Sequence, residues 1–305
     1  MEIKKVKIKM ILQDQSILTC FERDFHHLQF ELSPDYSYQE ADIILSDTCS
    51  LENLRGEECC ELQSEAHKLI AITDATTNEE VIQVVANCNI YHLISKRGAY
   101  LKSELLKTVE QIVLYGGCSF EQLIGKAADS EILIINDTQD IDKKIESILE
   151  SLHLEEFFDS PMNYVQTILN ELATNAIYNA PTQNNEQIYK ERDRTEKVKL
   201  PDGESVIVRV GMVDKHIIVS VKDPYGSLTK NRVVESLKRS IEEAGKPENK
   251  NGGAGLGLFL SYGYSNQIIF NVEQGKATEI ISIIECTKRY KNFRERVTSF
   301  HFFEK

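Results

Sequence analysis

Residues 251–258 read Asn-Gly-Gly-Ala-Gly-Leu-Gly-Leu, and the apolar run Phe-Leu-Ser-Tyr follows directly at 259–262. The glycines at 253, 255 and 257 leave a backbone without side chains, so that its N–H groups can surround phosphate oxygens. A helix that begins here would add the positive end of its dipole. A glycine-rich turn before a helix is also compatible with a simple flexible turn, so the interpretation depends on two segments upstream.

Both upstream segments carry polar side chains next to apolar runs. Residues 170–180 read Asn-Glu-Leu-Ala-Thr-Asn-Ala-Ile-Tyr-Asn-Ala, and residues 221–226 read Val-Lys-Asp-Pro-Tyr-Gly. On a helix, Glu171, Asn175 and Asn179 share one face, because four residues overshoot a full turn by only about 40°. An apolar stripe runs beside that face. This pattern predicts a helix that buries one side on a sheet and shows the three polar residues along its edge.

Taken in this order, the three segments resemble the histidine-kinase-like ATPases of the Bergerat fold. Residues 253–258 match the family's G-x-G-L-G-L box. Glu171 and Asn175 match its helical asparagine box, and Asp223 matches the aspartate that reads adenine. The glycine after Asp223 is displaced by one position relative to the family's D-x-G-x-G pattern, which affects the floor of the pocket. The resemblance covers roughly the second half of the chain.

The resemblance implies a site for ATP and Mg²⁺. It makes Asn175 the Mg²⁺ ligand, since Mg²⁺ prefers hard oxygen ligands and retains several waters. It makes Glu171, one helical turn away, the base that polarises an attacking hydroxyl or water. The other expected nucleotide-binding residues are Asn179, Asp223, Gly226, Gly253, Gly255, Leu256, Gly257, Leu258 and Thr278. Residues 227–252 would form the lid over the triphosphate.

Within this family, the strand and helix expected at 131–152 resemble those of the anti-sigma-factor serine kinases. Such proteins bind ATP, form homodimers, and phosphorylate or sequester a protein partner. His153 lies in Leu-His-Leu, which is not the context of a sensor-kinase phospho-acceptor. Beyond the helix at 163–180, residues 182–203 predict a loop, and the chain ends with a basic segment, 288–296, and the apolar run 300–303.

Apolar strands alternate with helical segments in the first half of the chain, a pattern that resembles the receiver domain of response regulators. Asp14, Asp47, Thr73 and Lys96 follow the first, third, fourth and fifth strands. The carboxyl ends of parallel strands meet at one edge of a doubly wound sheet, so these four residues are expected in one crevice. Asp47 holds the phospho-acceptor position. Gln13 stands where receivers carry a second acid, which leaves open a receiver-like domain that is never phosphorylated.

Composition adds limits to these expectations. A net charge of −13 opposes nucleic-acid binding and favours protein partners. No apolar run approaches the roughly 20 residues of a membrane span. The seven cysteines show no C-x-x-C spacing, which predicts reduced thiols in a cytoplasmic protein. The histidines show no zinc-binding spacing.

The sequence therefore predicts an α/β two-domain protein. Residues 1–125 would form a receiver-like doubly wound parallel sheet, and residues 126–305 an α/β sandwich of Bergerat type with a mixed, largely antiparallel sheet. The predicted function is cytoplasmic signalling, in which the second domain binds ATP–Mg²⁺ and phosphorylates or sequesters a protein partner under control of the first. The alternatives are a non-catalytic ATP-dependent interaction switch and a histidine kinase that acts on a partner's histidine.

Overall fold

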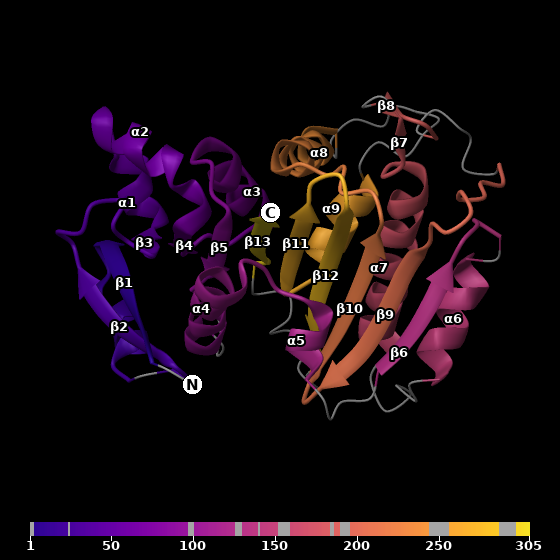
Figure 1. Ribbon diagram of the computed structural model, residues 1–305, viewed down its shortest axis with the longest axis horizontal. Helices are drawn as coiled ribbons and strands as arrows, with labels where there is room; N and C mark the ends of the chain where they lie inside the picture. Colours follow the sequence, from indigo (N-terminus) through magenta and orange to yellow (C-terminus); the bar gives the residue numbers. More distant parts are fainter. Residues whose placement is uncertain are drawn as a thin grey trace. The chain divides into compact units, whose positions relative to one another are not determined.

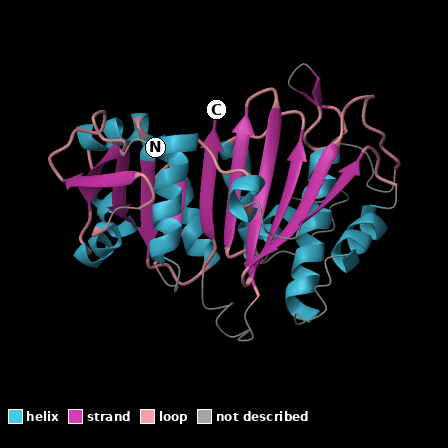
Figure 2. Ribbon diagram, turned by 60° about the horizontal axis from the view of Figure 1, so that its bottom comes forward, coloured by secondary structure: helices cyan, strands magenta, loops and turns pink. Residues whose placement is uncertain are grey.

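The computed structural model describes residues 3–23, 25–96, 101–125, 130–139, 141–151, 159–183, 186–189, 196–243, 256–286 and 297–305. Contacts divide the chain into two compact units. The first comprises Met1–Gly117 with Arg296–Phe303, and the second comprises Cys118–Glu295 with Glu304–Lys305. Each unit combines helices with strands (Figures 1 and 2), which confirms the α/β class predicted from the sequence.

The sheet of the first unit follows the strand order β2-β1-β3-β4-β5-β13. Neighbouring strands from β2 to β5 pair in parallel, whereas β13 pairs antiparallel with β5. The strands are β1 (Lys4–Ile11), β2 (Leu28–Ser33), β3 (Ile43–Asp47), β4 (Leu69–Thr73), β5 (His92–Ser95) and β13 (Ser299–Glu304). The parallel pairing of the first five strands agrees with the parallel sheet predicted for this half of the chain.

Strands β4 and β5 are buried along their whole length, as expected for parallel strands covered on both faces. Part of the apolar core lies between the sheet and two helices, η1 and α4, which supply Phe21 and Leu105. Helix α3 begins at a capping box, in which Thr77 accepts from the Glu80 N–H group. The helices are η1 (Gln15–Phe21), α1 (Thr48–Asn53), α2 (Glu57–Ser64), η2 (Ala66–Lys68), α3 (Asn78–Asn87), α4 (Leu101–Glu110) and η3 (Gln111–Tyr115).

The second unit has a different sheet, in which every neighbouring pair of strands is antiparallel. Its strand order is β11-β12-β10-β9-β6. The strands are β6 (Ser130–Ile135), β9 (Val206–Val213), β10 (His216–Asp223), β11 (Gln267–Glu273) and β12 (Ala277–Glu285). The β9–β10 hairpin turns at Asp214, whose φ of 53° lies in the left-handed region that aspartate tolerates. The alternation of apolar and polar residues in β9 and β10 is typical of such a hairpin.

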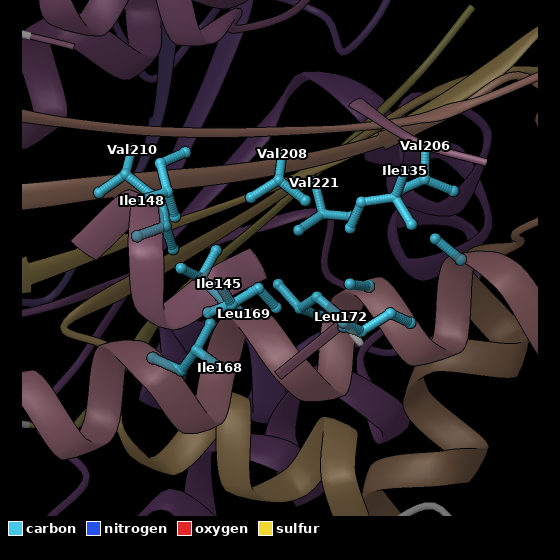
Figure 3. Packing of buried hydrophobic residues seen from close by; sticks show 14 of the residues in the cluster. Ile135, Ile145, Ile148, Ile168, Leu169, Leu172, Val206, Val208, Val210 and Val221 are labelled. Atoms are coloured by element: carbon cyan, nitrogen blue, oxygen red, sulfur yellow. The ribbon is translucent and has the colours of Figure 1, made fainter. Parts of the chain in front are cut away.

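Three helices pack on one face of this sheet, namely α6 (Ile141–Ser151), α7 (Asp159–Tyr178) and α9 (Leu256–Gly263). Figure 3 shows the core that joins them to the strands: Leu169 and Leu172 of α7 and Ile145 of α6 point toward Val208 and Val221. Burying each such side chain stabilises the fold by about 1.5–3 kcal/mol. Helix α7 is therefore fixed against the strands along the face that carries these residues.

Two further helices belong to the described part of this unit. Helix α5 (Phe120–Ile124) contacts β9 and β10, and α8 (Lys230–Glu243) contacts α9. The segment before α5 is fixed by two reciprocal hydrogen bonds to Asn271 of β11. Its side chain accepts from the Cys118 N–H group at 2.9 Å and donates to the Cys118 carbonyl at 2.6 Å. The half-buried Asn271 amide thus satisfies both backbone groups of Cys118, which lies outside a helix or strand.

Two regions differ from the sequence expectation. The loop expected at 182–203 contains a short antiparallel pair, β7 (Thr182–Gln183) with β8 (Glu186–Gln187). The apolar run near the C-terminus forms β13, which joins the sheet of the first unit rather than continuing the second half of the chain.

Candidate functional site

Asp223 ends β10 with its carboxylate in the helix-covered face of the second sheet. Side chains alternate along a strand, so Asp223 points to the same face as Val219 and Val221, which lie in the core. It lies directly opposite Thr278 on β12. Only 6% of Asp223 is exposed. Burial raises the pKa of Asp223 to about 6, although the N–H groups of Tyr225 and Gly226 and the neighbouring Thr278 oppose the rise. The chain thus keeps a carboxylate where ionisation is costly.

The hydroxyl of Thr278 is buried beside this carboxylate without a well-aligned hydrogen bond. A buried hydroxyl that lacks a good partner costs free energy, so natural proteins rarely retain one without a use. Together, Asp223 and Thr278 offer one acceptor and one hydroxyl side by side. A planar heterocycle could pair with both groups, its amino group donating to the carboxylate and its ring nitrogen accepting from the hydroxyl.

Gly226 holds the loop after Asp223 in place. Its φ of 59° is left-handed, and an added Cβ would lie 2.1 Å from the Glu273 carbonyl oxygen. The Gly226 carbonyl accepts from the Gly275 N–H group at 3.1 Å, which joins the loop to the β11–β12 turn. Tyr225 fixes the same loop from the other side by donating to Glu204 at 2.6 Å. The displaced glycine of the sequence motif therefore has a structural role at its own position.

The helical asparagine box lies at the C-terminal part of α7. Asn179 donates its side-chain amide to the Asn175 side-chain oxygen at 2.8 Å, one turn earlier. Gln187 of β8 donates to the Asn179 carbonyl at 2.5 Å. Ser227, in the loop after Asp223, donates to the carbonyl of Ala180 at 2.7 Å. These bonds bring the end of α7 together with the loop that holds Asp223.

Glu171 lies against α9, the helix that follows the glycine-rich stretch. An added Cβ at Gly257 would lie 1.8 Å from Glu171 Oε2, so the carboxylate occupies the space that any other residue at 257 would fill. Leu258, next along α9, packs against the core of the unit. Gly253 and Gly255 lie outside the described residues, as do His153 and the side chain of Leu256. The structure thus brings Glu171 and Gly257 together.

Lys230 is a residue that the sequence motifs do not identify. It begins α8, is 6% exposed, and has its pKa lowered to about 8 by burial, an effect that Glu304 opposes. A buried lysine near the loop at 226–229 could neutralise an anionic ligand. The only sequence signal was a basic residue at the start of a helix in a polar segment, which is too common to single it out.

The four expected residues of the first unit do meet at the carboxyl edge of its parallel strands. Lys96 forms an ion pair with Asp14, and its Nζ lies 3.6 Å from Asp74. The hydrogen bonds from Lys96 and Ser16 lower the pKa of Asp14 to about 2. Thr73 is buried, and its backbone carbonyl accepts a hydrogen bond from the Lys96 N–H group at 2.9 Å. The Lys96 ammonium thus already pairs with the Asp14 carboxylate at the carboxyl edge of the parallel strands.

Asp47 uses both carboxylate oxygens within the unit. One oxygen caps α1 by accepting the Ser50 N–H group at 2.7 Å. The other accepts the N–H group of Gln13 at 2.6 Å and that of Asp14 at 3.3 Å. Burial raises the pKa of Asp47, but these hydrogen bonds outweigh it and hold the pKa below its usual value. Asp47, the expected phospho-acceptor, therefore caps α1 and holds the backbone at Gln13 and Asp14 in place.

Comparisons of the sequence with models of known protein families and with curated proteins found no match. None of the helices among the described residues is long and apolar enough to cross a membrane. In the same part of the chain, no three or more His, Cys, Asp or Glu side chains are grouped so as to hold a metal ion.

The first prediction concerns Gly226. Gly226→Ala should destabilise the protein by roughly 2–5 kcal/mol, because it adds a collision with a backbone carbonyl to the strain of a left-handed φ. Gly275→Ala is the matched control, since Gly275 has a φ of 69° but no atom within 4 Å of an added Cβ. It should cost only about 1–2 kcal/mol. Urea unfolding measures both, and equal costs would show that the close approach is unimportant.

The second prediction concerns Asp47. Incubation with acetyl phosphate or beryllofluoride and Mg²⁺ should give little modification of Asp47, because three backbone N–H groups occupy its oxygens and Lys96 pairs with the neighbouring Asp14. Intact-mass spectrometry measures the outcome, with Asp47→Asn as the control for other sites. Stoichiometric, Mg²⁺-dependent addition that disappears in Asp47→Asn would contradict this reading.

Proposed function

We propose that the second unit binds ATP with Mg²⁺ and transfers its terminal phosphoryl group to a protein partner, as the anti-sigma-factor serine kinases do. The observation that carries the proposal is the buried Asp223 carboxylate opposite the poorly partnered hydroxyl of Thr278. The adenine amino group would donate to Asp223, and Thr278 would serve the adjacent ring nitrogen directly or through a water. The adenine amino group would then add a donor to the buried Asp223 carboxylate, and the Thr278 hydroxyl would gain a well-aligned partner.

The remaining residues of the proposed site have separate tasks. The Asn175 amide oxygen, which accepts from Asn179, keeps a second lone pair that can ligate Mg²⁺. The backbone of residues 253–257 would donate N–H groups to phosphate oxygens, and Lys230 would add positive charge. ATP supplies the phosphoryl group and a good leaving group. Transfer then depends on position and charge compensation rather than on covalent chemistry by the protein.

Glu171 is the proposed base. It would accept the proton from a serine or threonine hydroxyl of the partner as that oxygen bonds to the terminal phosphorus and ADP leaves. Gly257 leaves the space that the Glu171 carboxylate occupies. The same contact supports a second candidate function, a non-catalytic switch, in which the carboxylate stays packed on α9 and ATP only determines which partner binds. Under either function we propose that the protein acts as a cytoplasmic homodimer controlled by its receiver-like unit.

The third prediction tests nucleotide binding. ATP with Mg²⁺ should raise the melting temperature, since a ligand that binds only the folded state stabilises it. Asp223→Asn should weaken ATP binding about ten- to a hundredfold, because its oxygen would stay on the Tyr225 N–H group and its amide would face the adenine donor. Asp202→Asn, at a side chain that is 98% exposed, is the matched control. No shift with wild-type protein at millimolar ATP would overturn the proposal.

The same variant gives a test that needs no ATP. The folded-state pKa of Asp223 lies above its unfolded value, so the folded state holds the proton more tightly. Stability is therefore lost as the pH rises from about 4 to about 6, by on the order of 3 kcal/mol in total. Asp223→Asn should melt above the wild type at pH 8, and the difference should shrink toward pH 4. A difference in melting temperature that stays the same from pH 4 to pH 8 would show that the pKa of Asp223 is not raised by burial.

The fourth prediction separates the two candidate functions. Glu171→Gln should leave ATP affinity within a fewfold of the wild type and reduce transfer to a partner by roughly 10²–10⁴-fold. Asp142→Asn, on an exposed position of α6, is the control. Transfer is measured with labelled ATP and candidate partner proteins, and acid-stable label distinguishes serine or threonine from histidine. Full transfer by Glu171→Gln would refute the assigned base, and ATP-dependent partner binding without any label would favour the switch.

A further inference from the structure

The sheet of the second unit ends at an edge strand, β6, whose outer side meets no other strand among the described residues. β6 pairs with β9 and is the last strand in the order β11-β12-β10-β9-β6 (Figure 1). Its sequence, Ser-Glu-Ile-Leu-Ile-Ile at 130–135, contains four consecutive apolar residues and a single charge. An edge strand presents a row of backbone N–H and C=O groups, so β6 has the groups with which a further strand would pair.

Two isoleucines of β6 are exposed on the same face of the sheet. Ile132 lies opposite Arg209 of β9, and Ile134 lies opposite Ile207, on the face turned away from the core under α6, α7 and α9. Helix α5 contacts β9 and β10, yet Ile132 and Ile134 are both 61% exposed. Neighbouring apolar side chains exposed on an unpaired edge are typical of a surface that associates with another chain.

The edge strand of the first unit, β2, shows how this chain protects an edge elsewhere. β2 alternates the polar residues Gln29, Glu31 and Ser33 with apolar ones, and Glu31 forms an ion pair with Lys5 at 2.9 Å. Polar and charged side chains on an edge strand discourage further pairing. β6 has no proline and no charge after Glu131, so it lacks these protective features.

A second copy of the same chain fits this edge. When two β6 strands pair antiparallel about a two-fold axis through Leu133, Ile132 of each copy lies opposite Ile134 of the other. The four isoleucines then form one apolar cluster on one face of the joined sheet. Glu131 lies opposite Ile135 of the other copy, so the two Glu131 carboxylates do not face each other. The strand is therefore complementary to itself.

The charges of helix α6, which packs on β6, are self-complementary as well. In its first turn Lys143 and Lys144 outnumber Asp142, whereas Glu146 and Glu150 are exposed farther along the helix. The two-fold axis that pairs the β6 strands also sets the two α6 helices antiparallel. The lysines of one copy then lie nearest the glutamates of the other, and this opposite charge favours a second copy as the occupant of the edge despite the net charge of −13.

We propose that two copies of the protein associate through β6, so that their second-unit sheets join into one continuous sheet. This interface belongs to the homodimer included in the proposed function, and it needs no nucleotide. A six-residue strand is about 20 Å long, and a stable interface of standard size buries about 800 Å² on each partner. β6 therefore supplies only part of such an interface, with α6 at its side, and the dissociation constant should be on the order of micromolar.

Analytical ultracentrifugation of the full-length protein without nucleotide tests this interface. The wild type should shift from monomer to dimer as its concentration rises from about 1 to about 100 μM. Ile132→Lys with Ile134→Lys should raise the dissociation constant about tenfold or more, because like charges of the two copies would meet at the pairing. Ile3→Lys with Tyr115→Lys is the matched control, since these first-unit side chains are 62% and 48% exposed and the added charge is the same. It should dimerise like the wild type.

A variant of opposite charge separates loss of the interface from loss of the fold. Ile132→Glu with Ile134→Glu should be monomeric alone, whereas its equimolar mixture with the lysine variant should form a heterodimer. The interface is refuted if the lysine variant dimerises like the wild type, or if the mixture forms no heterodimer. It is also refuted if the wild type stays monomeric at about 100 μM, which would leave the edge to a strand of another protein. Absence of ATP binding would leave all of these outcomes unchanged, so the two proposals fail separately.

Discussion

The central constraint of the second unit is the burial of a carboxylate at the end of its middle strand. The side chains of β10 alternate between the two faces of the sheet, which places Asp223 on the helix-covered face. The three residues that follow must then leave the sheet without covering the Asp223 carboxylate. Gly226 makes that exit possible by adopting a left-handed φ against a carbonyl of the β11–β12 turn. The loop then continues to Ser227, which bonds to the end of α7. The relative positions of strand, turn and helix all follow from this exit.

Much of this architecture was predictable from local pattern. Strands β3 and β4 read as continuous apolar runs because parallel strands are buried on both faces, and β9 and β10 read as a hairpin because their faces alternate. Strand β13 was not predictable. Its residues form an apolar run like many others, and its partner β5 lies about two hundred positions earlier, where no periodicity links the two. Only tertiary packing determines such a pairing.

The candidate site shows the same division. Glu171, Asn175 and Asp223 were identified because they match motifs of the family that the sequence resembles, and helical periodicity places the first two on one face. The contact between Glu171 and Gly257 joins two segments by close packing, which spacing alone cannot give. The possible role of Lys230 depends on its burial, and burial of a polar residue at a helix end leaves no distinctive sequence signal. The hydrogen bonds of Asp47 were likewise hidden, because a residue after a strand can equally be an acceptor or a helix cap.

Asp47 and Asp223 show how the surroundings decide the role of a strand-end aspartate. Asp47 accepts three backbone N–H groups, and these bonds hold its pKa low, so its lone pairs are committed to the fold. Asp223 also accepts hydrogen bonds, among them those from the Tyr225 and Gly226 N–H groups, but its deeper burial outweighs them and its pKa is raised. A carboxylate of the first kind stabilises its own unit and has little left to offer a ligand. A carboxylate of the second kind costs stability while it is ionised, and this cost is the physical basis on which we propose ligand recognition for Asp223 rather than for Asp47.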